Sequence, residues 1–175
     1  MKFEKINSKL AWTGKVFDVV VDTFKIEDNI VERQYITSNY EAVVVLPITQ
    51  ENKVVLVSQF RSATGGMLAE LPAGKTEPSE DLQVAAIREL EEETGYKAQK
   101  MTYLGNAYAS PGISSEMYHF YVATDLVKGQ AHPDADEDTV AVEIPFDEFV
   151  NSVKSGRITD TKTIAVTGLW LMRNK

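Results

Sequence analysis

The segment that most constrains this chain is a glycine-initiated turn that runs into a helix crowded with carboxylates, GKTEPSEDLQVAAIRELEEETGY, residues 74–96. Glu89, Glu92 and Glu93 stand at i, i+3 and i+4, which places them on one side of the predicted helix, whereas Glu91 points elsewhere. Three negative charges on one stripe repel each other and destabilise an isolated helix. A hard divalent cation reverses that effect, because Mg2+, Mn2+ and Ca2+ prefer oxygen ligands. The segment therefore predicts a cation site.

Composition and charge exclude several classes of protein. The chain has 175 residues, enough for one domain with a sizeable core or a core plus a small appendage. A net charge of −8 argues against a nucleic-acid backbone or an anionic membrane as the main partner. Cysteine is absent, which rules out a disulfide framework and a thiolate metal site. The N-terminus lacks the apolar core of a signal peptide and no apolar run approaches membrane-spanning length, so a cytoplasmic location is expected.

Residues 1–40 have the pattern of a small antiparallel β unit. Residues 15–25 (KVFDVVVDTFK) are rich in β-branched and aromatic side chains, and residues 32–37 (ERQYIT) read as a partner strand. Asp28 and Asn29 between them are typical of a turn. Three short strands bury little core alone. We therefore expect this unit to pack on the main domain or on a second subunit.

Residues 41–175 are predicted to form the main domain. Residues 42–48 (AVVVLPI) are a continuous apolar run, as in a strand buried on both faces. Residues 53–60 (KVVLVSQF) are predicted to return as the second strand of a hairpin. Residues 61–68 contain Thr64, Gly65 and Gly66 and are predicted to be a loop.

The acidic helix is predicted to begin near Ser79, whose hydroxyl can cap it, and to end at Gly95. Its core-facing stripe is predicted to be Leu82, Ala85, Ala86 and Leu90. Further strands are expected over residues 101–107, 116–124 and 140–144, and further helices over residues 147–155 and 161–173. Because helices alternate with strands that include hairpins, an α/β fold with a mixed sheet between helices is favoured over a purely parallel sheet.

Read in full, residues 74–96 match the pattern GX5EX7REUXEEXGU, in which U is a bulky apolar residue. This stretch resembles the signature of the Nudix hydrolases, with the aromatic Tyr96 in the last U position as a mild departure. The resemblance implies an α/β/α sandwich. A solvated glutamate-rich helix face is the simpler alternative. That alternative explains the acidity but not Gly74, Arg88 and Gly95 at their spacings.

The resemblance also implies roles for the residues of this segment. Glu89 and Glu93 take the places of the principal metal ligands, and Glu92 that of a third or more distant carboxylate. The carbonyl of Ala73 completes a metal's shell, and Arg88 orients a carboxylate rather than touching the substrate. Glu80 is either a peripheral ligand or an electrostatic contributor at the helix start. The implied cofactor is Mg2+, with Mn2+ as a substitute, because a pyrophosphate needs its charge neutralised and a water made nucleophilic.

Three flanking motifs resemble the ADP-ribose pyrophosphatases within that family. They are Gln59-Phe60-Arg61, the run from Glu70 to Gly74, and Ser110-Pro111-Gly112, with Glu116 four residues beyond the glycine. In this comparison Arg61 clamps a phosphate, and the alternative is a surface arginine at a strand end. Arg33 is a second phosphate candidate. Glu70 either accepts hydrogen bonds from the substrate or stabilises its loop.

Pro111 and Gly112 are expected to shape a loop over the terminal ribose, although a plain turn also explains them. Glu116 either accepts a hydrogen bond from a ribose hydroxyl or is solvated at a strand start. Glu137, in the acidic loop of residues 134–138, lies where the subfamily supplies a mobile catalytic glutamate. We predict it to be the general base or the last metal ligand, with a solvated loop as the alternative. Ala135 stands where many members carry a second glutamate.

Adenine usually stacks on an aromatic ring, and Trp12, Phe17, Tyr35 and Tyr40 are available in the N-terminal unit, although each is also a core candidate. In the subfamily this region reaches across a homodimer and completes the partner's site. Residues 38–41 (SNYE) depart from the small, glycine-containing step that is usual before the next strand. This departure leaves room for other ADP-sugars.

The reaction that the resemblance implies is metal-dependent hydrolysis of the pyrophosphate bond of ADP-ribose to AMP and ribose 5-phosphate. One alternative is hydrolysis of another nucleoside diphosphate sugar, such as a GDP- or UDP-sugar, or of a dinucleotide. Another is a regulator that binds ADP-ribose without cleaving it. The intact Arg88-Glu89 and Glu92-Glu93 pairs argue against the regulator, since a binding module does not need the metal-binding stripe.

Overall fold

The computed structural model describes residues 2–38, 40–131 and 139–174. The chain divides into two compact units, one comprising Met1–Glu41 with Tyr108–Met117 and the other Ala42–Ala107 with Tyr118–Lys175. The loop that follows the long strand β8 (Tyr96–Tyr108) thus joins the N-terminal residues in the first unit. The dimerisation and substrate contacts predicted for residues 1–40 stay predictions.

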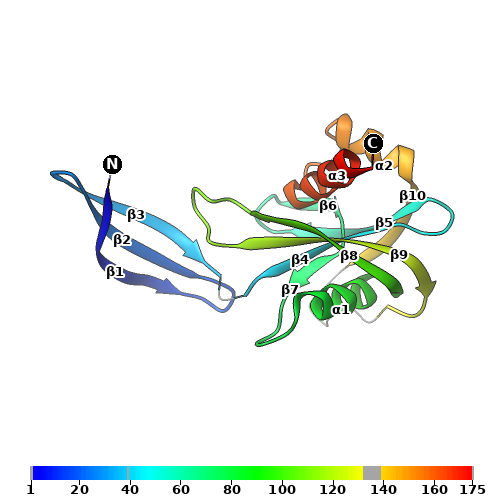
Figure 1. The fold of residues 1–175 in the computed structure, drawn as a ribbon, viewed down its shortest axis with the longest axis horizontal. Helices are drawn as coiled ribbons and strands as arrows, with labels where there is room; N and C mark the ends of the chain where they lie inside the picture. The colour runs from blue at the N-terminus through cyan, green and yellow to red at the C-terminus, as the bar shows by residue number, and fades with distance from the viewer. Residues whose placement is uncertain (1, 39, 132–138, 175) are drawn as a thin grey trace. The chain divides into compact units, whose positions relative to one another are not determined.

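The first unit is built on a three-stranded antiparallel sheet, drawn in blue in Figure 1. Its strands are β1 (Phe3–Thr13), β2 (Asp18–Ile26) and β3 (Asn29–Thr37), in the order β1-β2-β3. Strands β2 and β3 match the predicted pair, and the sequence predicts no bounds for β1, whose apolar residues do not alternate cleanly. The loop after β8 is tied to β3, because the N–H of Ile36 donates to the carbonyl of Ile113 at 2.8 Å.

The second unit contains two sheets. The first has the order β7-β4-β9-β8, with β4 (Ala42–Pro47) parallel to β9 (Met117–Lys128) and antiparallel to β7 (Ala73–Lys75). The second has the order β10-β5-β6 and is antiparallel, with strands β5 (Lys53–Arg61), β6 (Gly66–Glu70) and β10 (Val140–Pro145). The predicted mixed sheet is therefore confirmed.

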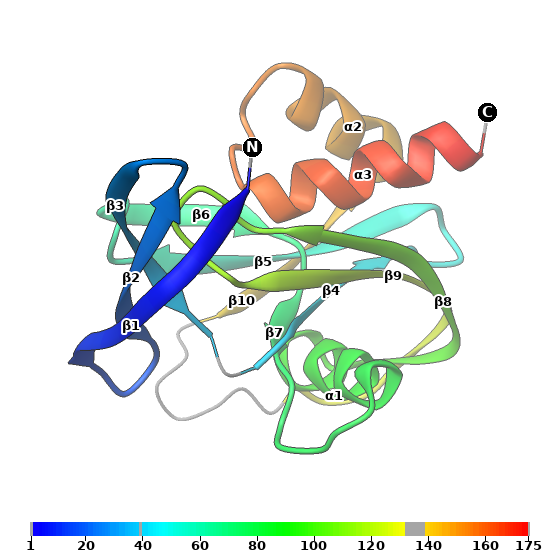
Figure 2. The ribbon, with the colours of Figure 1, turned by 60° about the vertical axis from the view of Figure 1, so that its left-hand side comes forward.

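Helices cover both sides of these sheets, which confirms the predicted α/β/α sandwich. Helix α1 (Leu82–Thr94) lies on one side, and α2 (Phe146–Lys154) and α3 (Thr161–Arg173) lie on the other (Figures 1 and 2). Strand β4 shows why its run is apolar throughout, since alternate side chains serve opposite layers. Val43 and Val45 pack in the cluster with Leu90 of α1, whereas Val44 and Leu46 pack in the cluster of α2 and α3.

The predicted hairpin of residues 42–48 and 53–60 is wrong. Strands β4 and β5 enter different sheets, and a single isolated bridge, Ile48 to Val54, connects their ends. The reason is that each strand already has a neighbour on both edges. Strand β4 lies between β7 and β9, and β5 lies between β10 and β6. A short turn between two apolar strands therefore does not by itself predict that they pair.

Two local predictions also need correction. Helix α1 is capped not by Ser79 but by Asp81, whose carboxylate accepts from the N–H groups of Gln83 and Val84, while Ser79 has a φ of 65°. The segment 61–68 is not all loop, because β6 begins at Gly66 after a turn in which Gly65 has a φ of 71°. The predicted end of α1 at Gly95 agrees with the structure, where that residue has a φ of 72°.

In the part of the chain that the structure describes, none of the helices combines the length and the apolar composition that crossing a membrane requires. The cytoplasmic location stays a prediction.

Candidate functional site

The acidic stripe lies on α1, directly after the turn through β7. Glu89 and Glu93 are almost fully buried, with 8% and 3% of their surface exposed, and Glu92 lies nearer the solvent. Burying a carboxylate costs several kcal/mol unless a cation or hydrogen-bond donors compensate its charge. The stripe is therefore a place where the fold concentrates negative charge.

Arg88 is the internal cation of this cluster. Its guanidinium donates to Glu80 through Nε and Nη2, both at 2.9 Å, to Glu89 at 2.8 Å and to Glu92 at 2.9 Å. A further bond, from Nη2 to the carbonyl of Lys75 at 3.0 Å, ties α1 to the preceding turn. These carboxylates, Glu80 first, hold the pKa of Arg88 well above its ordinary value, although burial opposes the shift.

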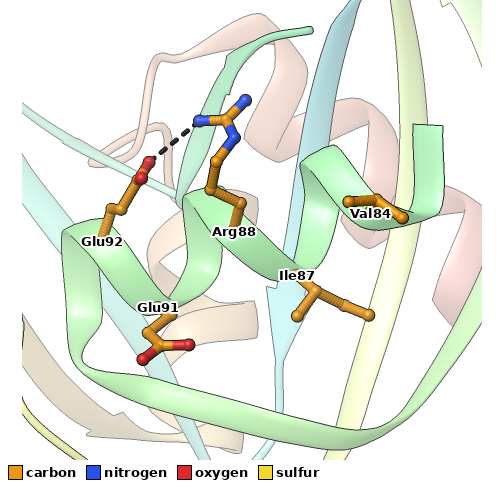
Figure 3. A pocket seen from close by; sticks show the side chains of 5 residues that line it. All are labelled: Val84, Ile87, Arg88, Glu91 and Glu92. Atoms are coloured by element: carbon orange, nitrogen blue, oxygen red, sulfur yellow. Dashed lines mark hydrogen bonds and ion pairs between the residues drawn. The ribbon is translucent and has the colours of Figure 1, made fainter. Parts of the chain in front are cut away.

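Figure 3 shows Arg88 and Glu92 on one side of α1, joined by their ion pair, with Glu91 directed away from them. Glu91 instead pairs with Lys97 at 2.9 Å. A pocket of about 460 Å³ opens at this face of the helix, lined by Val84, Ile87, Arg88, Glu91 and Glu92. Of the acidic cluster, Arg88 and Glu92 take part in lining this pocket.

Strand β7 is fitted closely to the buried carboxylates, and Gly74, predicted to begin a turn, lies in this strand instead because it pairs with Val43 of β4. A Cβ on Gly74 would lie only 2.1 Å from the carboxylate carbon of Glu89, so no other residue leaves room for that side chain. The N–H of Ala73 donates to an oxygen of Glu93 at 3.0 Å. The glycine and the residue before it thus bring the backbone of β7 against Glu89 and Glu93.

These residues fit a hard divalent cation in charge and ligand type. One guanidinium, that of Arg88, is shared by the carboxylates of Glu80, Glu89 and Glu92, and the buried carboxylate of Glu93 lies on the same stripe of α1. Strand β7 passes close to these carboxylates at Gly74, next to the carbonyl of Ala73 that was predicted as a further oxygen ligand. Among residues 2–38, 40–131 and 139–174, however, no group of three acidic or histidine side chains is already arranged around one point. A cation would therefore have to draw the carboxylates together.

A second charged network lies on the other sheet, where Arg61 at the end of β5 meets Glu70 at the end of β6. Arg61 donates to Glu70 through Nε at 2.8 Å and through Nη2 at 2.6 Å, a two-pronged contact. Glu70 is 1% exposed, and its second oxygen also accepts from Lys162 of α3. Burial raises the pKa of Glu70, but the bonds and charges of Arg61 and Lys162 more than offset this and leave it below its ordinary value.

Glu70 therefore stabilises its own loop in this structure, which is one of its two predicted roles, while both of its oxygens are occupied. The side chain of Arg61 is 40% exposed. The bonds to Glu70 raise the pKa of Arg61, and burial opposes this shift. The negative charges of Asp160 and Glu93 add to the rise. Sequence reasoning missed Lys162, whose only signal was a lysine in the first turn of a helix, where a cation is unfavourable.

A pocket of about 520 Å³ lies wholly within the first unit. It brings together three of the predicted substrate residues, Arg33 from β3 and Pro111 and Gly112 from the loop after β8. Its other walls include the aromatic rings of Phe24, Tyr35 and Tyr108 and the hydroxyls of Ser114 and Ser115. Sequence reasoning named Tyr35 but missed Tyr108, because an aromatic residue in a strand is more often part of a core.

Asp22, also missed, forms the buried floor of that pocket. Its carboxylate accepts from Ser8 at 2.6 Å, from Lys5 at 3.0 Å and from the hydroxyl of Tyr35 at 3.4 Å. The bond from Ser8 and then that from Lys5 lower the pKa of Asp22. One carboxylate thus fixes β1, β2 and β3 at the point where Tyr35 faces the pocket.

The remaining predicted site residues are not gathered with these. Glu116 is half-buried at the base of its loop, where its carbonyl accepts from the N–H of Ala109 at 2.9 Å. Glu137 lies outside the described residues. Among the aromatic candidates, Trp12 and Phe17 pack on each other with ring centres 5.5 Å apart, and Tyr40 is exposed.

Comparison with known proteins shows the family to which this chain belongs. The model of the NUDIX domain matches residues 39–165. A methanol dehydrogenase activator of Bacillus methanolicus is 38% identical over 161 residues, 91% of this chain and 87% of that protein. An ADP-ribose pyrophosphatase of Bacillus subtilis (strain 168) is 35% identical over 154 residues, 87% of this chain and 83% of that protein.

A GDP-mannose pyrophosphatase of Escherichia coli (strain K12) is also 35% identical, over 132 residues, 70% of this chain and 69% of that protein. Among solved structures, an ADP compounds hydrolase superposes with a TM-score of 0.84 at 23% identity, covering 99% of this chain and 94% of that one. At that identity the superposition shows a shared fold. The match over residues 39–165, together with relatives that are similar over most of the chain, shows that this chain belongs to the NUDIX domain family.

Proposed function

We propose that this chain is a metal-dependent hydrolase that cleaves the pyrophosphate bond of ADP-ribose to AMP and ribose 5-phosphate. The observation that carries the proposal is the set of buried carboxylates on α1, Glu89 and Glu93, packed against strand β7 at Gly74, where a Cβ would meet the carboxylate of Glu89. The ADP-ribose pyrophosphatase of Bacillus subtilis, similar over most of the chain, supports the choice of substrate.

In this proposal Glu89, Glu92, Glu93 and the carbonyl of Ala73 would hold Mg2+, or Mn2+ in its place. The bound cation would neutralise the pyrophosphate and lower the pKa of a water molecule. Arg88 holds the carboxylates in position through its bonds to Glu80, Glu89 and Glu92. Glu137 accepts the proton from the attacking water, and Arg61 binds a phosphate oxygen.

The net reaction breaks one P–O bond of the bridging oxygen. The oxygen of water forms the new bond to phosphorus, the bridging oxygen leaves with the other phosphate, and the proton of water passes to a base and then to solvent. Within the pocket of the first unit, Arg33 carries a charge suited to an anionic group, and Tyr35 and Tyr108 offer ring faces to a nucleobase or sugar. We assign Pro111, Gly112 and Glu116 to the ribose side of that pocket.

The test is hydrolysis of a panel containing ADP-ribose, GDP-mannose, a UDP-sugar and a dinucleotide, each with Mg2+ and with a chelator. We expect AMP and ribose 5-phosphate from ADP-ribose, formed fastest in the panel and suppressed by the chelator. A faster reaction with GDP-mannose than with ADP-ribose would show that GDP-mannose is the preferred substrate. Tight binding of ADP-ribose without hydrolysis of any compound in the panel would contradict the proposal that this chain is an enzyme.

A second candidate function follows from the relative of Bacillus methanolicus, which is named as an activator of methanol dehydrogenase. In that candidate the chain acts on a dehydrogenase as its partner. The discriminating measurement is dehydrogenase activity with the wild-type chain and with Glu93→Gln. Activation that is equal for both proteins favours a binding role, and activation that is lost with Glu93 makes hydrolysis part of the effect.

We also propose that the chain is a homodimer that pairs through the first unit. Every residue of β1 is exposed, and Phe3, Ile6, Leu10 and Trp12 put large apolar side chains on that edge strand. Exposed apolar side chains on an edge strand favour association. Light scattering should give twice the chain's mass, and Leu10→Asp should shift it toward the monomer. A monomeric wild type would contradict the proposal.

A further inference from the structure

Lys162 occupies a position that helix stability alone does not explain. It lies in the first turn of α3, where the helix dipole disfavours a cation, and only 7% of its surface is exposed. Lysine is almost never buried to this extent unless it is paired. Its ammonium donates to Glu70 and, at 3.0 Å, to Asp160, the residue that caps α3. The ammonium is thus held between two carboxylates, those of Glu70 and Asp160.

The contact between Arg61 and Glu70 leaves one edge of the guanidinium available. Glu70 receives Nε and Nη2 of Arg61, so the Nη1 side lies outside that two-pronged contact, on a side chain that is 40% exposed. A guanidinium held by two of its nitrogens loses little rotational freedom when the third side binds an anion. The contact thus orients Arg61 in advance for an anionic group.

Charge balance shows what Lys162 adds to that arrangement. Without it, the single charges of Arg61 and Glu70 cancel, and a phosphate arriving at Arg61 meets a neutral pair beside the carboxylate of Asp160. With it, two cations stand against Glu70 and Asp160, and the ammonium contacts both carboxylates. The charge of Arg61 is then only partly cancelled by Glu70. Because the network is largely buried, the ammonium acts at short range with little screening by solvent.

We propose that Lys162 is a positioning residue for substrate binding, which acts through Glu70 to orient the Arg61 guanidinium and to keep its charge available to an anionic group. This inference rests on the proposed function, in which Arg61 binds a phosphate of the substrate. Lys162 itself does not touch the substrate. Its role differs from that of Arg88, which forms ion pairs with the carboxylates of the acidic cluster on α1.

Substitutions that change the charge in opposite directions test this role. Lys162→Met removes a cation and should raise the KM for ADP-ribose about 10-fold, with kcat changed by less than about threefold, because a binding contact is weakened. Asp160→Asn removes an anion but keeps a good helix cap, and should lower the KM. Lys162→Arg should restore most of the affinity. A merely structural role predicts that Lys162→Met and Asp160→Asn shift the KM in the same direction, and that result would overturn the proposal.

Coupling to Arg61 is measured by a double-mutant cycle. In an Arg61→Gln background, Lys162→Met should change the KM by less than about twofold, since the group it acts through is gone. An equal effect in both backgrounds overturns the inference. Calorimetric titration with inorganic pyrophosphate repeats the cycle without catalysis. If the wild type fails to hydrolyse ADP-ribose, the proposed function fails, whereas the inference fails if pyrophosphate affinity is the same in the wild type and Lys162→Met.

Discussion

The two charged clusters of the second unit are built in opposite ways. On α1, the guanidinium of Arg88 forms ion pairs with the carboxylates of Glu80, Glu89 and Glu92. The buried carboxylate of Glu93 is on the same stripe of the helix. At the ends of β5 and β6, the buried carboxylate of Glu70 forms ion pairs with both Arg61 and Lys162. The first cluster has an excess of negative charge and the second does not.

This difference separates the two tasks that pyrophosphate chemistry requires. A cluster of several carboxylates around one guanidinium favours a divalent cation, whereas a cluster in which two cations share one buried carboxylate favours an anion. The charge of Glu93 adds a small part to the raised pKa of Arg61, whose main cause is its bond to Glu70. On this basis we propose that the chain, although net acidic, binds an anionic substrate at Arg61 and a metal at the acidic stripe of α1.

The largest effect should follow Glu93→Gln, which removes a ligand charge from the acidic cluster. We expect kcat on ADP-ribose to fall on the order of 10²-fold or more while circular dichroism stays unchanged. Glu91→Gln is the matched control, because Glu91 is directed away from the cluster and pairs with Lys97 (Figure 3). Equal losses in the two variants would remove the distinction between the two sides of α1.

Gly74→Ala should have the next largest effect, because its Cβ would lie 2.1 Å from the carboxylate carbon of Glu89. The displaced carboxylate should lower kcat by about 10- to 100-fold, and the crowding should cost about 1–3 kcal/mol of unfolding free energy. Gly168→Ala on α3 is the control, since a Cβ there meets nothing within 4 Å. A fully active Gly74→Ala protein would show that the turn does not position Glu89.

Arg88→Met should expose the charge excess of the acidic cluster. Without the guanidinium, Glu80, Glu89 and Glu92 lose their shared partner, and we expect a loss of about 2 kcal/mol, between the values typical of exposed and buried pairs. Added Mg2+ should raise the Tm of this variant more than that of the wild type, as measured by thermal unfolding. The same gain in Arg88→Met and the wild type, or a gain in the control Arg173→Met that exceeds that of the wild type, would contradict the charge argument.

The smallest effect concerns pH and tests the second cluster. The pKa of Glu70 is below its ordinary value in the folded state, so its contribution to stability is complete above about pH 4.5 and is lost as the pH falls through the lowered pKa. Glu70→Gln should therefore flatten the decline in unfolding free energy below pH 4.5, and Glu148→Gln, at an exposed position, should not. An equally steep decline in Glu70→Gln would show that its two cations do not hold it ionised.

The sequence predicted the parts of this molecule that local chemistry determines. The acidic stripe, the end of α1 at Gly95 and the sandwich followed from spacing, turn residues and the resemblance, and the family is confirmed. The strand 42–48 was also recognised as buried on both faces. These features depend on residues that lie close together along the chain.

The features that the sequence did not reveal depend on residues far apart. The hairpin prediction failed because sheet neighbours of β4 come from residues 73–75 and 117–128. Lys162 is 92 positions from Glu70, so its ammonium had no visible partner. Pairing of Tyr108 with Arg33 in one pocket likewise needs the loop after β8 to meet β3. Patterns along the chain do not contain such distant contacts.

Cation binding by the acidic cluster is the most direct test of this account. Mn2+ can be titrated into the wild type, Glu93→Gln and Arg61→Gln, with loss of the free-ion electron paramagnetic resonance signal as the measure. The account predicts that the wild type and Arg61→Gln bind Mn2+ equally, and that Glu93→Gln binds it at least 10-fold more weakly. Equal binding by the wild type and Glu93→Gln would contradict the assignment of the cation to α1.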